Sequence, residues 1–178
     1  MPYDVRRIAG LVTYYGGKFY IRRKLYALMP SSAGVYVEPF VGGGSFFFGR
    51  EVRYPVEVVN DIDPCLINLY RVVQSSSYKE LKRLLTYTPY SRYHQRAAHE
   101  AYIEVVRRGK VIDDAVRFAY HTMCSFIFSW GGVGKAWSFG LEANRASAFR
   151  NRIEWLEYHH TYLQGVIILK KDVMEVID

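Results

Sequence analysis

The sequence has few cysteines and no long apolar run, and each shortage excludes a class of protein. Cys65 and Cys124 form no Cys-x-x-Cys pair and have no neighbouring histidine pair, so we expect no metal site. Small buried hydrophobes are the expected role for both, and a disulfide between them stays an open alternative. No apolar stretch reaches the length of a membrane span, because Arg, Asp or Gly interrupts the longest ones. No apolar segment follows the early arginines, so no secretory signal is predicted and we expect a cytoplasmic protein without a membrane partner.

Acidic residues are also in the minority. The chain carries 24 Lys and Arg against 17 Asp and Glu, which gives a net charge of +7. A basic balance favours a polyanionic partner, most simply nucleic acid. Half of the 178 residues are hydrophobic and 16% are aromatic, which excludes a disordered chain and suffices for one core.

Hydrophobic spacing predicts an α/β fold. Strands are expected at 35–40, 56–61 and 165–173, where β-branched and aromatic residues gather. Helices are expected at 19–29, from Ser45 onward, from Asp63-Pro64 to 74, throughout 76–127 with a stop at Gly109 and a start at Asp113-Asp114, and at 144–163. We therefore predict a sheet core from 1–75 and 164–178, with a helical insertion at 76–163 that holds a Gly- and aromatic-rich hairpin at 129–140.

The stretch "VEPFVGGGSFFFGR" at 37–50 places three glycines directly after the first predicted strand. No Lys-Ser/Thr follows them and the spacing is not Gly-x-Gly-x-x-Gly, so neither a phosphate loop nor a dinucleotide site is predicted. Glycines let the backbone approach a ligand closely, and an acid after the next strand, Asp61 or Asp63, can accept both hydroxyls of a ribose. Together they suit an adenosyl ligand without phosphates. The structural alternatives are a plain glycine turn and, for Asp63, a helix cap.

Three motifs occur in one order: "YYGGK" at 14–18, "EPFVGGGS" at 38–45 and "NDIDPCLINLY" at 60–70. In this combination the sequence resembles the Dam-type DNA adenine-N6 methyltransferases, which use S-adenosylmethionine. "SFIFSWGGVGKAWSFG" at 125–140 is similar to the family's hairpin segment, although its Asn and Pro positions are altered, and "VIILKKDV" at 166–173 resembles a strand that ends near the cofactor. The similarity spans nearly the whole chain and implies a Rossmann-like cofactor-binding sheet.

The resemblance also implies roles for individual residues. Tyr15, Gly17 and Lys18 would lie by the methionine end of the cofactor, Asp61 would hold the ribose, and Asp172 would lie near the adenine. The remaining implied cofactor residues line the pocket: Glu38, Phe40, Gly42 and Gly44.

One family motif, the tetrapeptide Asp-Pro-Pro-Tyr, does not occur in this sequence. It is needed to hold the exocyclic amine of a flipped adenine in line with the methyl donor. We therefore name no catalytic residue, and expect an N-terminal part of a methyltransferase that is inactive without a second chain or a C-terminal part. The alternative is a non-catalytic DNA-binding or regulatory protein on the same scaffold. A small-molecule or RNA methyltransferase is disfavoured by the paired glycine motifs.

The insertion is rich in basic residues, and in the family it holds double-stranded DNA. Lys135, between Trp130 and Trp137, is the best single candidate for a DNA contact. Arg92, Arg96 and Arg117 are candidates for phosphate contacts. The alternative is that such arginines form solvated faces or pair with neighbouring glutamates. Further basic residues of the same region are Arg107, Arg108, Lys110, Arg145, Arg150 and Arg152.

Overall fold

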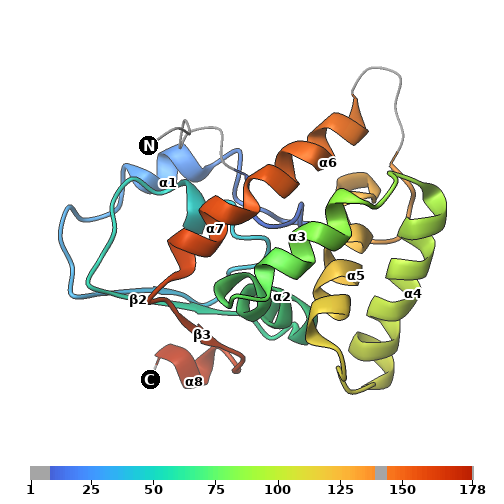
Figure 1. Cartoon of the computed structure of the whole chain (residues 1–178). Coiled ribbons are helices and arrows are strands. Elements are labelled where there is room, and N and C mark those ends of the chain that lie inside the picture. The colour runs from blue at the N-terminus through green and yellow to red at the C-terminus, as the bar shows by residue number, and fades with distance from the viewer. Residues whose placement is uncertain (1–8, 139–143, 178) are drawn as a thin grey trace.

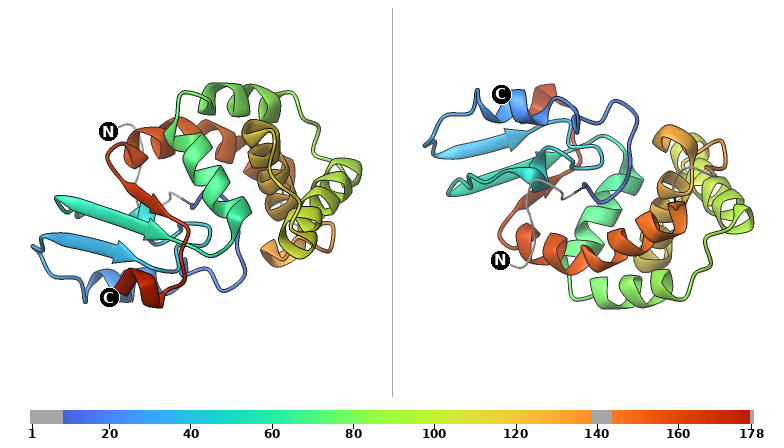
Figure 2. Two further views of the ribbon diagram at one scale, coloured as in Figure 1. Left: turned by 90° about the horizontal axis from the view of Figure 1, so that it is seen from below. Right: turned by 90° about the horizontal axis from the view of Figure 1, so that it is seen from above.

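The computed structural model describes residues 9–138 and 144–177 and shows a mixed α/β protein (Figure 1). Its sheet has the strand order β1-β2-β3, from β1 (Val35–Glu38), β2 (Val56–Asn60) and β3 (Ile167–Leu169), and all pairs are parallel. Parallel strands need crossover connections, and these place all three carboxyl ends at one edge of the sheet. Figure 2 shows that the strands point toward the helices built from the middle of the chain.

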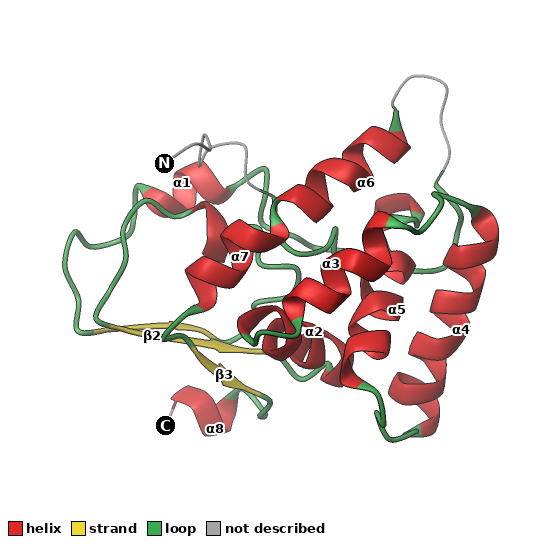
Figure 3. Cartoon of the chain, in the orientation of Figure 1, coloured by secondary structure: helices red, strands yellow, loops and turns green. Residues whose placement is uncertain are grey.

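Helices form most of the remaining structure, and the sheet is small beside them (Figure 3). The described helices are α1 (Arg22–Tyr26), α2 (Pro64–Gln74), α3 (Tyr78–Thr86), α4 (Arg92–Arg108), α5 (Ala115–Ile127), α6 (Arg145–Glu154), α7 (Leu156–Leu163) and α8 (Met174–Ile177), with 3-10 turns η2 (Phe47–Gly49) and η3 (Trp130–Gly132). The helical prediction for 76–127 is confirmed as α3, α4 and α5.

Local capping signals are confirmed where they were expected. The Asp63 carboxylate accepts a hydrogen bond from the backbone nitrogen of Cys65 at 2.8 Å, with Pro64 as the first residue of α2. Gly109 ends α4 in the left-handed conformation at φ 66°, and Asp114 caps α5. These ends follow from the chemistry of one or two residues, which is why the sequence reveals them.

Three helix predictions are wrong in extent. The segment after the glycines does not open a helix at Ser45; it forms only the 3-10 turn η2, which has no side-chain cap. Phe47 and Phe48 are both fully buried there, and the chain becomes extended at Arg50 (ψ 138°), whose guanidinium contacts Glu57 at 2.9 Å. With both rings buried and the chain extended three residues later, this segment lacks the exposed polar face that a surface helix has.

A second prediction, one continuous helix at 144–163, is wrong because the helix is divided at Trp155 into α6 and α7. The third strand is shorter than expected, because Asn60 takes over the pairing beyond Leu169. Its side-chain amide donates to the carbonyl of Lys171 at 3.0 Å and accepts from the nitrogen of Lys171 at 2.9 Å. The predicted helix at 19–29 is reduced to α1 with turns on both sides.

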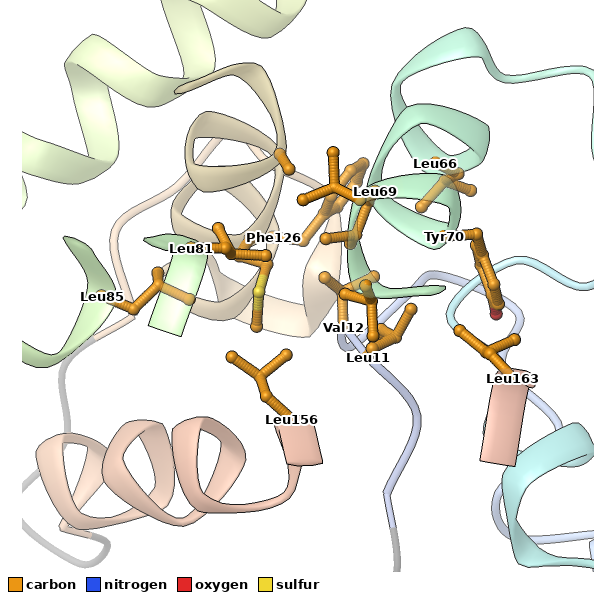
Figure 4. Packing of buried hydrophobic residues seen from close by; sticks show 14 of the residues in the cluster. Leu11, Val12, Leu66, Leu69, Tyr70, Leu81, Leu85, Phe126, Leu156 and Leu163 are labelled. Atoms are coloured by element: carbon orange, nitrogen blue, oxygen red, sulfur yellow. The ribbon is translucent and has the colours of Figure 1, made fainter. Parts of the chain in front are cut away.

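The larger hydrophobic core runs from the sheet through the helices, and a smaller cluster is formed by Cys65, Val105 and Phe118. The larger core includes Val59 of β2, Leu69 of α2 and Met123 of α5. Figure 4 shows that Leu11 and Val12 of the N-terminal segment pack among the side chains of α2, α5 and α7. Cys65 and Cys124 are buried free thiols, in agreement with their expected role as small buried hydrophobes. The domain boundaries at 75/76 and 163/164 stay a prediction.

The two faces of the sheet differ. Tyr36, Val59 and Ile168 lie on the face that packs against the core. The other face is apolar and only partly covered by the described residues: Val35, Val37, Val56 and Ile167 are between 39% and 55% exposed. Figure 1 shows α1 and α7 on one side of the sheet and only the short α8 on the other. Parallel sheets are usually covered on both faces, so this face is suited to a further layer.

Across the described part of the chain, no helix combines the length and the apolar character that crossing a membrane requires.

Candidate functional site

A cleft of about 940 Å³ opens beyond the carboxyl ends of β1 and β2. Its walls come from residues 9–20 of the N-terminal segment, the loop after β1, Asp61, Gly131 and Arg152. Ligands of parallel α/β sheets bind at this end of the strands. The cleft brings together six of the nine predicted cofactor residues, from three separate motifs: Tyr15, Gly17, Lys18, Phe40, Gly42 and Asp61.

Asp61 links the ends of β1 and β2. Its Oδ2 accepts a hydrogen bond from the Gly42 nitrogen at 2.9 Å, and its Oδ1 accepts one from the Asp63 nitrogen at 3.1 Å. A carboxylate oxygen can accept more than one hydrogen bond, so each keeps acceptor capacity toward the cleft. Asp63 instead caps α2 and accepts from the hydroxyl of Tyr102 at 2.6 Å. The two acids therefore have different tasks, and only Asp61 lines the cleft.

Glu38 does not line the cleft but anchors a residue that does. Lys18 Nζ lies 3.2 Å from Glu38 Oε1 and donates to the carbonyl of Phe40 at 2.9 Å, while the Tyr36 hydroxyl donates to Glu38 Oε2 at 2.7 Å. Burial raises the pKa of Glu38, and the Lys18 charge and both hydrogen bonds act against that rise. The contacts with Glu38 and with the Phe40 carbonyl hold the Lys18 side chain against the loop after β1.

The glycines are required by the protein itself. A Cβ at Gly43 would lie 2.3 Å from the carbonyl oxygen of Val12, and one at Gly44 would lie 2.4 Å from the hydroxyl of Tyr70. Gly42 and Gly44 also have positive φ angles of 52° and 76°. The N-terminal segment thus crosses the loop closely enough to occupy the space that we expected a ligand to need. Gly42 and Gly43 still present backbone to the cleft, whereas Gly44 does not line it.

Asp172 lies apart from the residues that line this cleft. It is exposed, and its Oδ1 accepts a hydrogen bond from the Met174 nitrogen at 3.0 Å at the start of α8. The predicted role beside the adenine stays a prediction.

A second cleft, of about 560 Å³, lies between α4 and the segment after η3. It brings together four of the predicted DNA contacts, and Gln95 fixes its wall by donating to the Gly134 carbonyl at 2.6 Å. Lys135 is exposed, and Arg96 pairs with Glu100 at 3.0 Å in an exposed ion pair of little energetic weight. The predicted residues that line it are Arg92, Arg96, Lys135 and Trp137.

The two tryptophans differ in their surroundings. Trp137 bridges to Ser129 as an antiparallel pair and packs on Tyr90 with ring centroids 4.7 Å apart, so it supports the hairpin from inside. Trp130 is 62% exposed, and residues 139 and 140 of the predicted hairpin lie outside the described residues. Arg117 is exposed in the first turn of α5, at the opposite end of that helix from Lys135.

Sequence reasoning missed Arg152 as a residue of the first cleft and grouped it only with the basic residues of the insertion. From α6 it donates to the Gly10 carbonyl at 2.7 Å and to the Thr13 hydroxyl at 2.8 Å. These contacts join residues about 140 positions apart in the sequence, so no local pattern signals them. In the described ranges no three His, Cys, Asp or Glu residues gather as a metal site.

Comparison with known proteins identifies a family for this chain. A family model described as D12 class N6 adenine-specific DNA methyltransferase matches residues 14–168. The Type II methyltransferase M1.LlaDCHI of Lactococcus lactis subsp. cremoris is 38% identical over 71 residues, 40% of this chain and 24% of the relative. The DNA adenine methylase of Haemophilus influenzae is 29% identical over 119 residues, 62% of this chain and 41% of the relative. The DNA N-6-adenine-methyltransferase of Escherichia phage P1 is 33% identical over 63 residues, 35% of this chain and 8% of the relative. The chain thus matches less than half the length of each relative.

Proposed function

The chain belongs to the D12 class of N6 adenine-specific DNA methyltransferases, and from this premise we propose that it binds S-adenosylmethionine in the cleft beyond β1 and β2. One observation carries the proposal: residues of the three motifs at 14–18, 38–45 and 60–70 line a single cleft at the carboxyl ends of the strands. We further propose that the mixed α/β architecture is a Rossmann-like cofactor-binding sheet with a helical insertion.

The residues of the cleft suit this ligand. Asp61 offers acceptor capacity for ribose hydroxyls, and the exposed rings of Tyr15 and Phe40 offer apolar surface to an adenosyl group. When bound, S-adenosylmethionine supplies an electrophilic methyl group on its sulfonium. The chain's own part is to orient that group, since positioning two reactants provides most of the catalysis in such a transfer.

For the DNA partner, we propose that the second cleft contacts phosphates of a duplex. Arg92, Arg96 and Lys135 surround it, and the exposed Trp130 lies nearby in the chain, suited to stacking on or between bases. Phosphate contacts would fix the register of the duplex without reading its sequence. The family description, DNA adenine methylation, is consistent with this assignment.

We also propose that this chain supplies cofactor binding and DNA recognition, while the Asp-Pro-Pro-Tyr segment that holds the adenine amine comes from a second chain or a C-terminal part. The partly covered apolar face of the sheet supports this, since Val35, Val37 and Ile167 offer a packing surface to a further layer. The relatives also contain sequence beyond the part that matches this chain, since the match covers 24% and 41% of their lengths.

Calorimetric titration of the 178-residue chain with S-adenosylmethionine tests the proposal. We expect saturable binding that Asp61→Ala weakens on the order of tenfold or more, because hydrogen bonds to a carboxylate are lost. Asp113→Ala, an exposed acid outside the cleft, is the matched control and should bind as the wild type does. No binding by the wild-type chain would contradict the proposed function.

A further inference from the structure

Among the described residues, two basic side chains line the proposed cofactor cleft, and their surroundings differ. Lys18 is already paired with the buried carboxylate of Glu38 at 3.2 Å. Arg152 has no carboxylate partner among the described residues; its two hydrogen bonds go to the neutral oxygens of Gly10 and Thr13. The cleft therefore contains one cation whose charge is balanced by the protein and one whose charge is not.

Arg152 keeps unused donors in this position. A guanidinium carries five N–H groups in a planar fork, and two of them serve the contacts to Gly10 and Thr13. Three donors are left on a side chain that lines the cleft. A planar fork of this kind matches the geometry of a carboxylate better than a lysine ammonium does.

The surroundings of Arg152 increase its need for an anion. Burial lowers the pKa of Arg152 from 12.5 to about 10, so the guanidinium is still charged at neutral pH, on a side chain that is half-buried at the cleft wall. A bound anion would return the stabilisation that water would otherwise provide.

We infer that Arg152 binds the carboxylate of the amino-acid end of S-adenosylmethionine, an inference that rests on the proposed function. The carboxylate is the one anionic group of this ligand, and Arg152 is fixed at the cleft wall by Thr13, which directly precedes the 14–18 motif. Arg152 also lies on α6 in the region of the proposed DNA-binding part, so it joins that part to the cofactor cleft through residues 10–13.

Three ligands separate this role from a purely structural one. 5′-Methylthioadenosine lacks the amino-acid end, and decarboxylated S-adenosylmethionine lacks only the carboxylate. Arg152→Gln should weaken S-adenosylmethionine on the order of tenfold to a hundredfold, as expected for charge-assisted hydrogen bonds, and leave 5′-methylthioadenosine unchanged. Arg150→Gln, an exposed arginine on the same helix, is the control and should change neither.

The wild-type chain gives an independent test that does not depend on the folding of a variant. It should bind decarboxylated S-adenosylmethionine on the order of tenfold more weakly than S-adenosylmethionine. Equal affinity of the wild type for S-adenosylmethionine and decarboxylated S-adenosylmethionine would overturn the inference. So would an Arg152→Gln variant that loses the same affinity for S-adenosylmethionine as for 5′-methylthioadenosine. If the wild type bound 5′-methylthioadenosine and S-adenosylmethionine equally, the cofactor cleft would stand and Arg152 would not hold a carboxylate. If it bound neither, the proposed function itself would fail.

Discussion

Asp61 accepts a hydrogen bond from the backbone nitrogen of Gly42 at 2.9 Å, so the acid after β2 holds the glycine loop after β1. The Tyr70 hydroxyl supports the same loop by donating to the Gly42 carbonyl at 3.2 Å. The loop is thus fixed from two sides before any ligand arrives. This preorganisation gives the cleft a defined wall, which reduces the ordering cost of binding.

Alanine substitutions test the tight crossing of the N-terminal segment over the loop. Gly43→Ala should lower the free energy of unfolding by about 1 to 3 kcal/mol, because its Cβ would meet the Val12 carbonyl. Gly34→Ala is the matched control: nothing lies within 4 Å of its Cβ and its φ is not positive, so it should be neutral or slightly stabilising. Urea unfolding measures both. Equal stability of the two variants would show that the segment does not cross the loop closely.

The Lys18–Glu38 pair predicts a non-additive pair of substitutions. Lys18→Met should destabilise the chain by about 1 to 3 kcal/mol, because it leaves the buried Glu38 carboxylate with Tyr36 as its main partner. Lys18→Met with Glu38→Gln should recover part of this loss, since the uncompensated charge is gone. Denaturant unfolding of the single and double variants completes the cycle, and additive effects would argue against a coupled pair.

His159 predicts a loss of stability in mild acid. Its Nε2 lies 3.0 Å from the Ala9 carbonyl, and burial lowers the pKa of His159 from 6.5 to about 3. The folded chain keeps the ring neutral while the unfolded chain protonates it below pH 6.5, so stability falls as the pH falls through this window. His159 alone should account for about 2 kcal/mol between pH 7 and pH 5.

Burial also lowers the pKa values of His99 and His121, which adds to the loss in the same direction. His159→Gln, whose amide can still donate to the Ala9 carbonyl, should reduce the pH dependence of unfolding between pH 7 and pH 5. Thermal unfolding across that range measures it. A slope identical to that of the wild type would mean that His159 is not held neutral.

For the proposed DNA partner, substitutions of Lys135, in the second cleft, and of Arg117, in the first turn of α5, test which surface contacts a duplex. Lys135→Ala should weaken binding to duplexes of any sequence and reduce the slope of log affinity against log salt by about 1, as expected for one lost phosphate contact. Fluorescence anisotropy at several salt concentrations measures this. Arg117→Ala shows whether the DNA site also reaches the far end of α5; no effect of Lys135→Ala would contradict a role for the second cleft.

Features that depend on neighbours in the sequence were predictable. The caps at Asp63 and Asp114, the left-handed Gly109 and the positions of β1 and β2 follow from local chemistry and hydrophobic spacing. The motif order also led to six residues that line one cleft. These are properties that a few adjacent residues decide by themselves.

Features that depend on distant contacts were not predictable. The glycines showed that something approaches closely, but only the fold shows that it is Val12 and Tyr70. The reach of Arg152 to Gly10 depends on how α6 packs, and the short η2 depends on how the core accepts two phenylalanines. Sequence spacing carries no record of these contacts.

Hydrogen–deuterium exchange shows where S-adenosylmethionine binds on the chain. The 178-residue chain is compared with and without the cofactor. We expect slower amide exchange in residues 9–20 and 40–45 on addition of the cofactor, with little change in α4. Protection confined to other segments, or none at saturating cofactor, would contradict binding in the cleft beyond β1 and β2.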